Sequence, residues 1–288
     1  MIAVRREIAG LSERRACRIL GVPRSSLRYA TKPTEFEVKI VSRLHELARE
    51  RPRFGTLRAT AVLREEGFDV NKKRIARLRR REGLKVRRKQ HKRRRLGTAA
   101  GGIRLSEAVG INDVWSYDFV SDQTEDGRTL KMLVIVDEFT RESVALEVGR
   151  HFTSGDVLTV LEYLFEVRGA PKHIRSDNGP EFIAKAVRRW LATQGVNTLF
   201  IEPGSPWQNA YVESFNSKLR DELLDRELFT TLAEARVILE DFRLDYNHRR
   251  PHSSLDYMTP AAFAARLRED DSAPEASAPS SSRALAPV

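Results

Sequence analysis

In the first third of the chain, hydrophobic residues recur at the spacing of short α-helices. Residues 11–30 predict two of them: Ser12 caps the first, Gly21 ends it, and Pro23 starts the second. The buried side of the first helix is expected to be its apolar residues, Ala16, Ile19 and Leu20. A helix, a glycine turn and a second helix form the outline of a helix-turn-helix, although this signal alone is weak because most short helical hairpins do not bind DNA.

Residues 36–85 predict a second helical module. Its first helix carries one apolar face, made of Phe36, Ile40, Leu44 and Leu47. A second helix runs from Thr56 to Glu66, and Asn71 caps a third that Gly83 ends. The third helix turns Ile75 and Leu78 inward, and its cations are expected to point outward: Lys72, Lys73, Arg74, Arg77, Arg79, Arg80 and Arg81. So many cations on one short helix would repel one another, so we interpret this helix as facing DNA phosphates or a DNA groove.

From Asn112 onward the pattern changes to strands and longer helices. Strands are predicted over 114–120, 129–136, 143–148, 173–176 and 197–201, with a hairpin at Asp126-Gly127. Helices are predicted over 154–167, 181–194, 209–224 and 231–246. Three meandering strands followed by alternating helices and strands indicate an α/β fold, a mixed sheet with helices packed on it. The tail from Asp270, rich in Ser, Ala and Pro, is expected to be disordered.

Charge divides the chain in the same place. Residues 1–110 hold 31 Lys and Arg against 11 Asp and Glu, and the remainder holds 20 against 29, for a formal net charge of +11. The basic part suggests a nucleic-acid partner, whereas the acidic part would need metal or local cations to touch phosphates. The single cysteine, Cys17, excludes an internal disulfide and a thiolate zinc cluster and fits a reducing cytosol. No run is long enough to span a membrane, so no membrane partner is expected.

Three acidic residues stand out by their positions. Asp118 lies inside the apolar strand VWSYDFV, where an aspartate is costly unless it is paired or binds metal. Asp177 ends the strand HIRSD before the turn Asn178-Gly179-Pro180, and Glu213 lies early in a helix. Singly, each acid is more simply a cap, a turn residue or a solvated carboxylate. Together, they are the hard oxygen donors that two-metal phosphodiester chemistry needs.

The combination of motifs resembles a known family. WSYDF, SDNGPEF and NAYVESFNSKLRDE, with 35 residues between Asp177 and Glu213, resemble the three motifs of the retrovirus-integrase-like DDE recombinases. More narrowly, they are similar to bacterial insertion-sequence transposases, specifically the second-frame product of two overlapping reading frames. RFGTLRATAVLREEG, VNKKRIARL and YNHRRPHSSLDYMTP extend the likeness over about residues 11–265. The order and spacing of these motifs make the resemblance far more specific than a lone short motif.

The resemblance implies a ribonuclease-H-like core with a five-stranded mixed sheet and with Asp118, Asp177 and Glu213 as ligands of Mg²⁺ or Mn²⁺, two ions per active site. It implies metal-dependent cleavage at the element's end, strand transfer by the released 3′-hydroxyl, and a circular intermediate. Arg220, two helical turns after Glu213, is expected to meet DNA phosphate, although it could be an ordinary surface cation. Asn178 and Glu181 are expected to support Asp177 or touch DNA, with helix capping as an equal alternative for Glu181. The expected DNA contacts are Lys72, Lys73, Arg74, Arg77, Arg80, Arg81, Lys218 and Arg220.

We therefore predict six segments: a short helix-turn-helix (1–35), a basic helix-turn-helix module (36–95), a linker (96–111), an integrase catalytic core (112–225), a helical extension (226–268) and a tail (269–288). The expected partners are double-stranded DNA, both element ends and target, and further copies of the chain on that DNA, in the bacterial cytoplasm at the nucleoid. No leucine heptad is sustained over three repeats. An upstream-frame product, supplied by frameshift fusion, is thus expected to complete the protein. The alternatives are a catalytically silent DNA-binding regulator and a metal-dependent nuclease acting on RNA–DNA hybrids.

Overall fold

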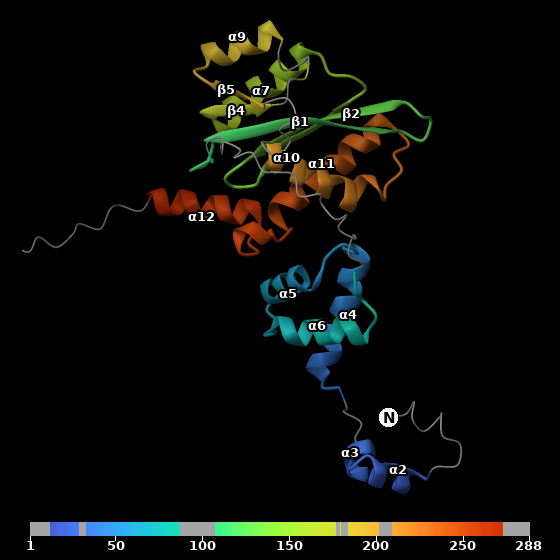
Figure 1. Cartoon of the computed structure of the whole chain (residues 1–288). Coiled ribbons are helices and arrows are strands. Elements are labelled where there is room, and N and C mark those ends of the chain that lie inside the picture. The colour runs from blue at the N-terminus through green and yellow to red at the C-terminus, as the bar shows by residue number, and fades with distance from the viewer. Residues whose placement is uncertain are drawn as a thin grey trace, which may run out of the picture.

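A computed structural model of the chain describes residues 12–28, 33–86, 107–176, 179, 184–201 and 209–272. It contains two helical parts before a mixed α/β core (Figure 1). No helix among these residues is both long and apolar enough to cross a membrane.

The first helical part is a pair of short helices, α2 (Glu13–Ile19) and α3 (Arg24–Arg28). The hydroxyl of Ser12 accepts a hydrogen bond from the backbone N–H of Arg15 at 3.3 Å, and Gly21 closes α2 with φ +62°, so the expected cap and stop are confirmed. The expected buried side is wrong, because Ile19 and Leu20 are 67% and 45% exposed and Cys17 is the buried residue. Two turns of helix cover too little area to bury a full apolar stripe without a further layer.

The second helical part is a three-helix unit of α4 (Glu35–Glu50), α5 (Thr56–Glu65) and α6 (Lys72–Arg81). Its core is the cluster that the sequence predicted, with Ile40, Leu44, Ile75 and Leu78 fully buried. Phe36 lies at the margin and is 37% exposed, with its ring 6.2 Å from that of Phe68. Asn71 caps α6 by accepting a hydrogen bond from the backbone of Arg74 at 2.9 Å.

The core is a five-stranded sheet in the order β3-β2-β1-β4-β5. The strands are β1 (Val114–Gln123), β2 (Thr129–Asp137), β3 (Ser143–Gly149), β4 (His173–Ser176) and β5 (Asn197–Phe200). β1, β2 and β3 pair antiparallel, whereas β4 and β5 run parallel to β1. The mixed five-stranded sheet with flanking helices is therefore confirmed.

Helices cover both faces of the sheet. α7 (Ser154–Arg168) and α9 (Lys185–Thr193) pack on one face, and α10 (Ala210–Leu219) and α11 (Leu232–His248) on the other (Figure 1). The predicted helix 209–224 is not uniform, because α10 passes into a π-helix, η2 (Arg220–Leu224). The 3₁₀ turn η3 (Ser253–Leu255) and α12 (Pro260–Ser272) complete the described chain. Residues 270–272 are thus helical, which corrects the expected start of the tail; the rest of the tail lies outside the described residues.

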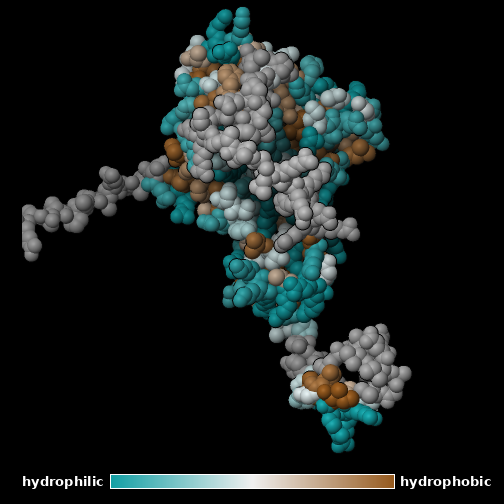
Figure 2. All heavy atoms as spheres, viewed as in Figure 1, coloured by the Kyte–Doolittle hydropathy of each residue, from teal (hydrophilic) through white to brown (hydrophobic). Residues whose placement is uncertain are grey.

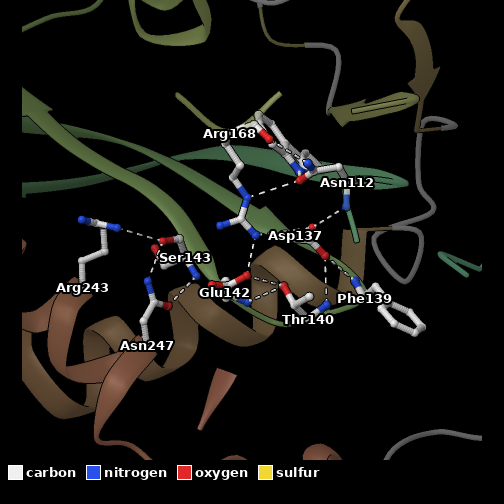
Figure 3. Close-up of polar contacts among 10 residues, drawn as sticks. Asn112, Asp137, Phe139, Thr140, Glu142, Ser143, Arg168, Arg243 and Asn247 are labelled. Atoms are coloured by element: carbon white, nitrogen blue, oxygen red, sulfur yellow. Dashed lines mark hydrogen bonds and ion pairs between the residues drawn. The ribbon is translucent and has the colours of Figure 1, made fainter. Parts of the chain in front are cut away.

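A buried polar network anchors the connection between β2 and β3 (Figure 3). Asp137, fully buried, accepts backbone N–H bonds from Phe139 and Thr140 at 2.9 Å each and from Asn112 at 2.9 Å. Asn247 of α11 exchanges two hydrogen bonds with the backbone of Ser143, at 2.8 and 3.0 Å. These bonds satisfy polar groups that the sheet cannot pair, and they hold the helical extension on the core.

Candidate active site and nucleic-acid interface

Alternation along β1 decides which way Asp118 faces. Trp115 and Tyr117 pack into the cluster beneath α7 and α9, whereas Val120 packs into the cluster beneath α10 and α11. Because successive side chains alternate between the two faces, Asp118 lies on the α10 side. Asp118 is half-buried rather than enclosed. A ligand can therefore reach its carboxylate.

Helix α10 brings Glu213 to the same face. Its buried residues Val212, Phe215 and Leu219 anchor it in the core cluster, which leaves Glu213 exposed. One turn beyond Glu213, the side-chain amide of Asn216 donates a hydrogen bond to Oδ2 of Asp118 at 2.8 Å. Residues three apart on a helix are neighbours on one face. Asn216 thus contacts Asp118 and lies one helical turn from Glu213.

The third expected acid, Asp177, lies outside the described residues, as do Asn178 and Glu181. The strand that precedes it is described: β4 ends at Ser176, and Arg175 pairs in parallel register with Ser116 of β1. Within the described residues no group of three or more His, Cys, Asp or Glu could hold a metal ion. The Asp118, Asp177 and Glu213 triad therefore stays a prediction.

A buried ion pair that the sequence did not reveal lies beside these strands. Nη1 of Arg175 lies 3.4 Å from Oε1 of Glu138, and both residues are almost fully buried. The hydroxyl of Ser116 also donates to Glu138. Burial raises the pKa of Glu138, against the opposing effects of Ser116 and Arg175. The one available signal was a pair of charges at strand ends, Arg175 in a short parallel strand and Glu138 directly after β2.

The first turn of α10 is braced by the β2–β3 connection. The guanidinium of Arg141 lies 3.9 Å from the ring centroid of Tyr211, and Arg141 also donates to the backbone carbonyl of Glu138. Two residues before Tyr211, buried Asn209 begins the helix. These contacts come from residues far apart in the sequence, and they set where the helix that carries Glu213 begins.

The two expected DNA-contacting cations near the end of α10, Lys218 and Arg220, differ in how exposed their side chains are. Arg220 is exposed, and its guanidinium donates to the backbone carbonyl of Ser121 on β1 at 3.5 Å, so it lies beside the strand that carries Asp118. Lys218 is half-buried, and burial together with the guanidinium groups of Arg250 and Arg58 lowers its pKa. Of the two, Arg220 has the exposure that a phosphate contact requires.

The cations of α6 do not all point outward. Lys72, Lys73, Arg77 and Arg80 are exposed as expected. Arg79 is 4% exposed, which corrects that expectation; it donates to the backbone carbonyls of Phe54 and Leu84 at 2.8 Å each. Helical periodicity explains the difference, because Arg79 is four residues after Ile75 and shares its buried face.

Two further α6 cations are engaged by an acid of α4. Arg81 donates to Glu37 at 2.6 Å, and Arg74 lies 3.9 Å from the same carboxylate and over the ring of Phe36. Arg81 is nevertheless exposed, so it remains accessible to a phosphate.

Comparison with known proteins places these parts in a family. Two family models described as "Integrase core domain" match residues 109–206 and 194–260, and an "HTH-like domain" model matches residues 35–93. The chain is 45% identical over 271 residues to the "Insertion element IS407 uncharacterized 31.7 kDa protein" of Burkholderia multivorans, covering 94% of this chain and 97% of the relative. It is 44% identical to an IS476 protein of Xanthomonas euvesicatoria, over 92% of this chain and 77% of the relative.

The chain belongs to the insertion-sequence transposases with an integrase core. A more distant relative is the transposase for IS904 of Lactococcus lactis, 27% identical over 78% of this chain and 91% of the relative. Among solved structures, the magnesium complex of the HTLV-2 integrase catalytic core is 17% identical, with a TM-score of 0.44, over 55% of this chain and 99% of that chain. The integrase-core models and the insertion-sequence relatives show that the protein is a polynucleotidyl transferase of the transposase and integrase type, which acts in transposition.

Integrase-like enzymes of this kind depend on a divalent metal, and the described donors of this transposase fit one. Asp118 and Glu213 offer hard carboxylate oxygens, the ligands that Mg²⁺ and Mn²⁺ prefer. Beside them, Oδ1 of Asn216 is buried and has no hydrogen-bond partner among the described residues. A buried acceptor with no donor is costly, and a neighbouring cation or its bound water would satisfy it.

Proposed function

We propose that Asp118, Asp177 and Glu213 are the catalytic residues of this transposase and hold the divalent metal, two ions per active site, with which it cleaves and joins DNA strands. The hydrogen bond from Asn216 to Asp118 is the observation that carries the proposal, because it brings β1 and the helix of Glu213 together. Bound there, the metal would neutralise charge on the phosphodiester and favour deprotonation of the attacking hydroxyl. The family comparison supports the reaction class.

The protein's own residues would then position the two strands. Asn216 would hold the Asp118 carboxylate in a fixed rotamer, and Arg220 would bind a phosphate beside it. Asn178 and Glu181, which follow Asp177 in the sequence, are proposed to support that carboxylate. Glu213 is exposed one turn before Asn216, as a group that meets substrate must be. No residue need form a covalent bond to DNA, since a 3′-hydroxyl can attack the next phosphodiester directly.

We further propose that double-stranded DNA is bound by the module of residues 36–95, through the exposed α6 cations, while residues 112–225 form the catalytic core, followed by the extension 226–268. Copies of the chain would assemble on the paired ends, at the nucleoid. An upstream-frame product would supply a dimerisation element; the 67% exposure of Ile19 leaves apolar surface on α2 for such a partner. Fusion to that product should raise joining of paired ends above the level of the chain alone, and strong end-specific joining by the chain alone would contradict this partnership.

The test is a cleavage assay with a labelled element end and Mg²⁺. Asp118→Asn, Asp177→Asn and Glu213→Gln should each abolish nicking and joining while leaving DNA binding near wild type, because shape is kept and a ligand charge is lost. Matched controls are Asp225→Asn and Glu227→Gln, which change exposed acids after the π-helix and should cleave normally. Nicking by a triad variant would remove that residue from the mechanism.

The same assay separates the alternatives. Wild-type binding without nicking would indicate a catalytically silent DNA-binding regulator. Cleavage confined to an RNA–DNA hybrid would indicate a nuclease instead.

A further inference from the structure

A groove of about 790 Å³ lies where the three-helix unit meets the helical extension. Its cations are Arg53, Arg58, Arg79, Arg80 and Lys85, all from the three-helix unit, and the extension contributes Ser253 and Tyr257. No Asp or Glu lines this groove among the described residues. We call it the Arg79 groove.

The positive charge of the groove is only partly neutralised. Arg53 lies 3.7 Å from Asp221 and Arg58 lies 3.5 Å from Glu222, so these two have acidic partners in η2. Arg80 and Lys85 are exposed, and no ion pair to either is found among the described residues. Exposed cations are common on protein surfaces, but these two line the same groove as the guanidinium groups of Arg53, Arg58 and Arg79.

Arg79 makes the groove unusual. Its Nη2 donates to two backbone carbonyls, but its Nη1 is buried without a hydrogen-bond partner among the described residues, and no carboxylate pairs with the side chain there. Burial lowers its pKa. A guanidinium stays charged in a protein, so a nearly buried one with no counter-ion is destabilising unless an anion arrives. The three-helix unit therefore retains a buried charge that its own fold does not balance.

Other donors point to the kind of anion. Helix α5 begins beside the groove at Gly55 and Thr56, and its N-terminus has no side-chain cap, which leaves its first backbone N–H groups open. Across the groove, Ser253 and Tyr257 carry hydroxyls. Guanidinium, backbone N–H and hydroxyl groups are the donors with which proteins bind phosphate.

A second cavity of about 640 Å³ at the same junction provides the contrast. It is lined by acids as well as cations, among them Glu50, Glu222, Asp241 and Asp245. A phosphate would meet repulsion there. The exposed surface of the three-helix unit is mostly hydrophilic in the face that Figure 2 shows.

We propose that the Arg79 groove binds a phosphate of the DNA backbone, so that the duplex is held where the three-helix unit meets the helical extension. This proposal rests on the proposed DNA-binding function and adds a site to it. It makes the extension part of the DNA interface, and it ties the position of the DNA to η2, the continuation of the helix that carries Glu213.

The test measures how salt weakens binding of the full chain to a duplex from the element's end, without divalent metal. Arg80→Gln with Lys85→Gln should lower the slope of log affinity against log salt by about one, since a lost phosphate contact removes about 0.9. The matched control, Arg49→Gln with Lys39→Gln, removes the same charge from exposed positions of α4 outside the groove and should leave the slope near wild type. Tyr257→Phe should also weaken DNA binding, because it removes a hydroxyl that the extension contributes to the groove.

A neutral methylphosphonate at single positions of the duplex locates the contact. One position should weaken wild-type binding several-fold and have no further effect on the Arg80→Gln, Lys85→Gln variant. Equal slopes for the groove and control variants would overturn the phosphate site in the groove, and so would a groove variant that stays as sensitive to methylphosphonate as the wild type. Neither result would contradict DNA binding by the wild-type chain. Failure of the wild-type chain to bind the duplex would contradict the proposed function itself.

Discussion

At the scale of single residues, this transposase places charges where water cannot screen them. Arg175 and Glu138 are 4% and 1% exposed, and Arg250, 1% exposed, donates to both oxygens of Glu222 at 2.6 and 2.7 Å. Such pairs seldom add net stability over apolar packing, but breaking one leaves a buried charge. Here the pairs fix the positions of neighbouring segments: Arg175 and Glu138 join β4 to the end of β2, and Arg250 joins the chain after α11 to η2.

Replacing Glu138 by leucine should expose that cost. Arg175 would lose the buried carboxylate of Glu138, so we expect Glu138→Leu to lower the free energy of unfolding by about 3–5 kcal/mol. Chemical denaturation measures this. The exposed control Glu227→Leu should change stability by about 0.5 kcal/mol or less. If Glu138→Leu with Arg175→Met is as unstable as the single variant, the loss of the Glu138–Arg175 pair is not the cause.

His252 should make stability depend on pH. Burial, and then the nearby guanidinium of Arg250, lower its pKa from 6.5 to about 4. The unfolded chain therefore binds the proton more readily than the folded chain. The contribution of neutral His252 to the free energy of unfolding is fully present above about pH 6.5 and is lost as the pH falls toward 4. The loss is at most about 3 kcal/mol before solvent screening. Urea denaturation of His252→Asn between these pH values should show a flatter profile than wild type. The exposed control His248→Asn should keep the wild-type slope.

At the scale of elements, helix ends determine where functional groups lie. The change from α10 to the π-helix η2 falls directly after Leu219, and it leads to Glu222, which contacts Arg58 and Arg250. π-turns are rare and are often found at functional sites. Here the turn lets one continuous segment carry both Glu213 and a contact to the DNA-binding module.

The N-terminus of α6 provides the element-scale prediction. Asn71 supplies the helix's side-chain cap, so Asn71→Ala should destabilise α6 by about 1 kcal/mol. Hydrogen exchange of the α6 amides should accelerate by about fivefold, and amides in α4 should change less. Asn71→Gly should cost only a few tenths of a kcal/mol, because glycine is tolerated at this position. Equal effects of the two substitutions would argue against the cap.

At the scale of the whole molecule, opposite charges hold the two parts together. Arg51 pairs with Asp245, Arg53 with Asp221 and Arg58 with Glu222, all between the three-helix unit and the acidic part of the chain after residue 111. Most of these groups are partly exposed, so each pair contributes little alone and is weakened by salt. The junction is therefore a polar interface whose ion pairs compete with DNA phosphates for the same cations.

The uneven charge predicts where DNA affinity resides. A fragment ending near residue 95 should bind duplex DNA and lose orders of magnitude in affinity between roughly 50 and 200 mM salt if six or more phosphates are contacted. The fragment from residue 112 onward should bind poorly because its net charge is negative. Fluorescence anisotropy with one labelled duplex compares them, and equal affinities would contradict this division.

The sequence by itself determined the elements, the sheet and the family, because local hydrophobic period, caps and motif spacing are properties of neighbouring residues. It also located Asp118 and Glu213 on the elements where the structure has them. Only the tertiary structure decided that Arg79 is buried, that Ile19 is exposed, and that Glu138 pairs with Arg175. Burial and pairing depend on which other segments pack against a residue. The four-residue spacing from Ile75 places Arg79 on the inner face of α6, but the folded chain supplies the carbonyls of Phe54 and Leu84 that let a guanidinium stay buried there.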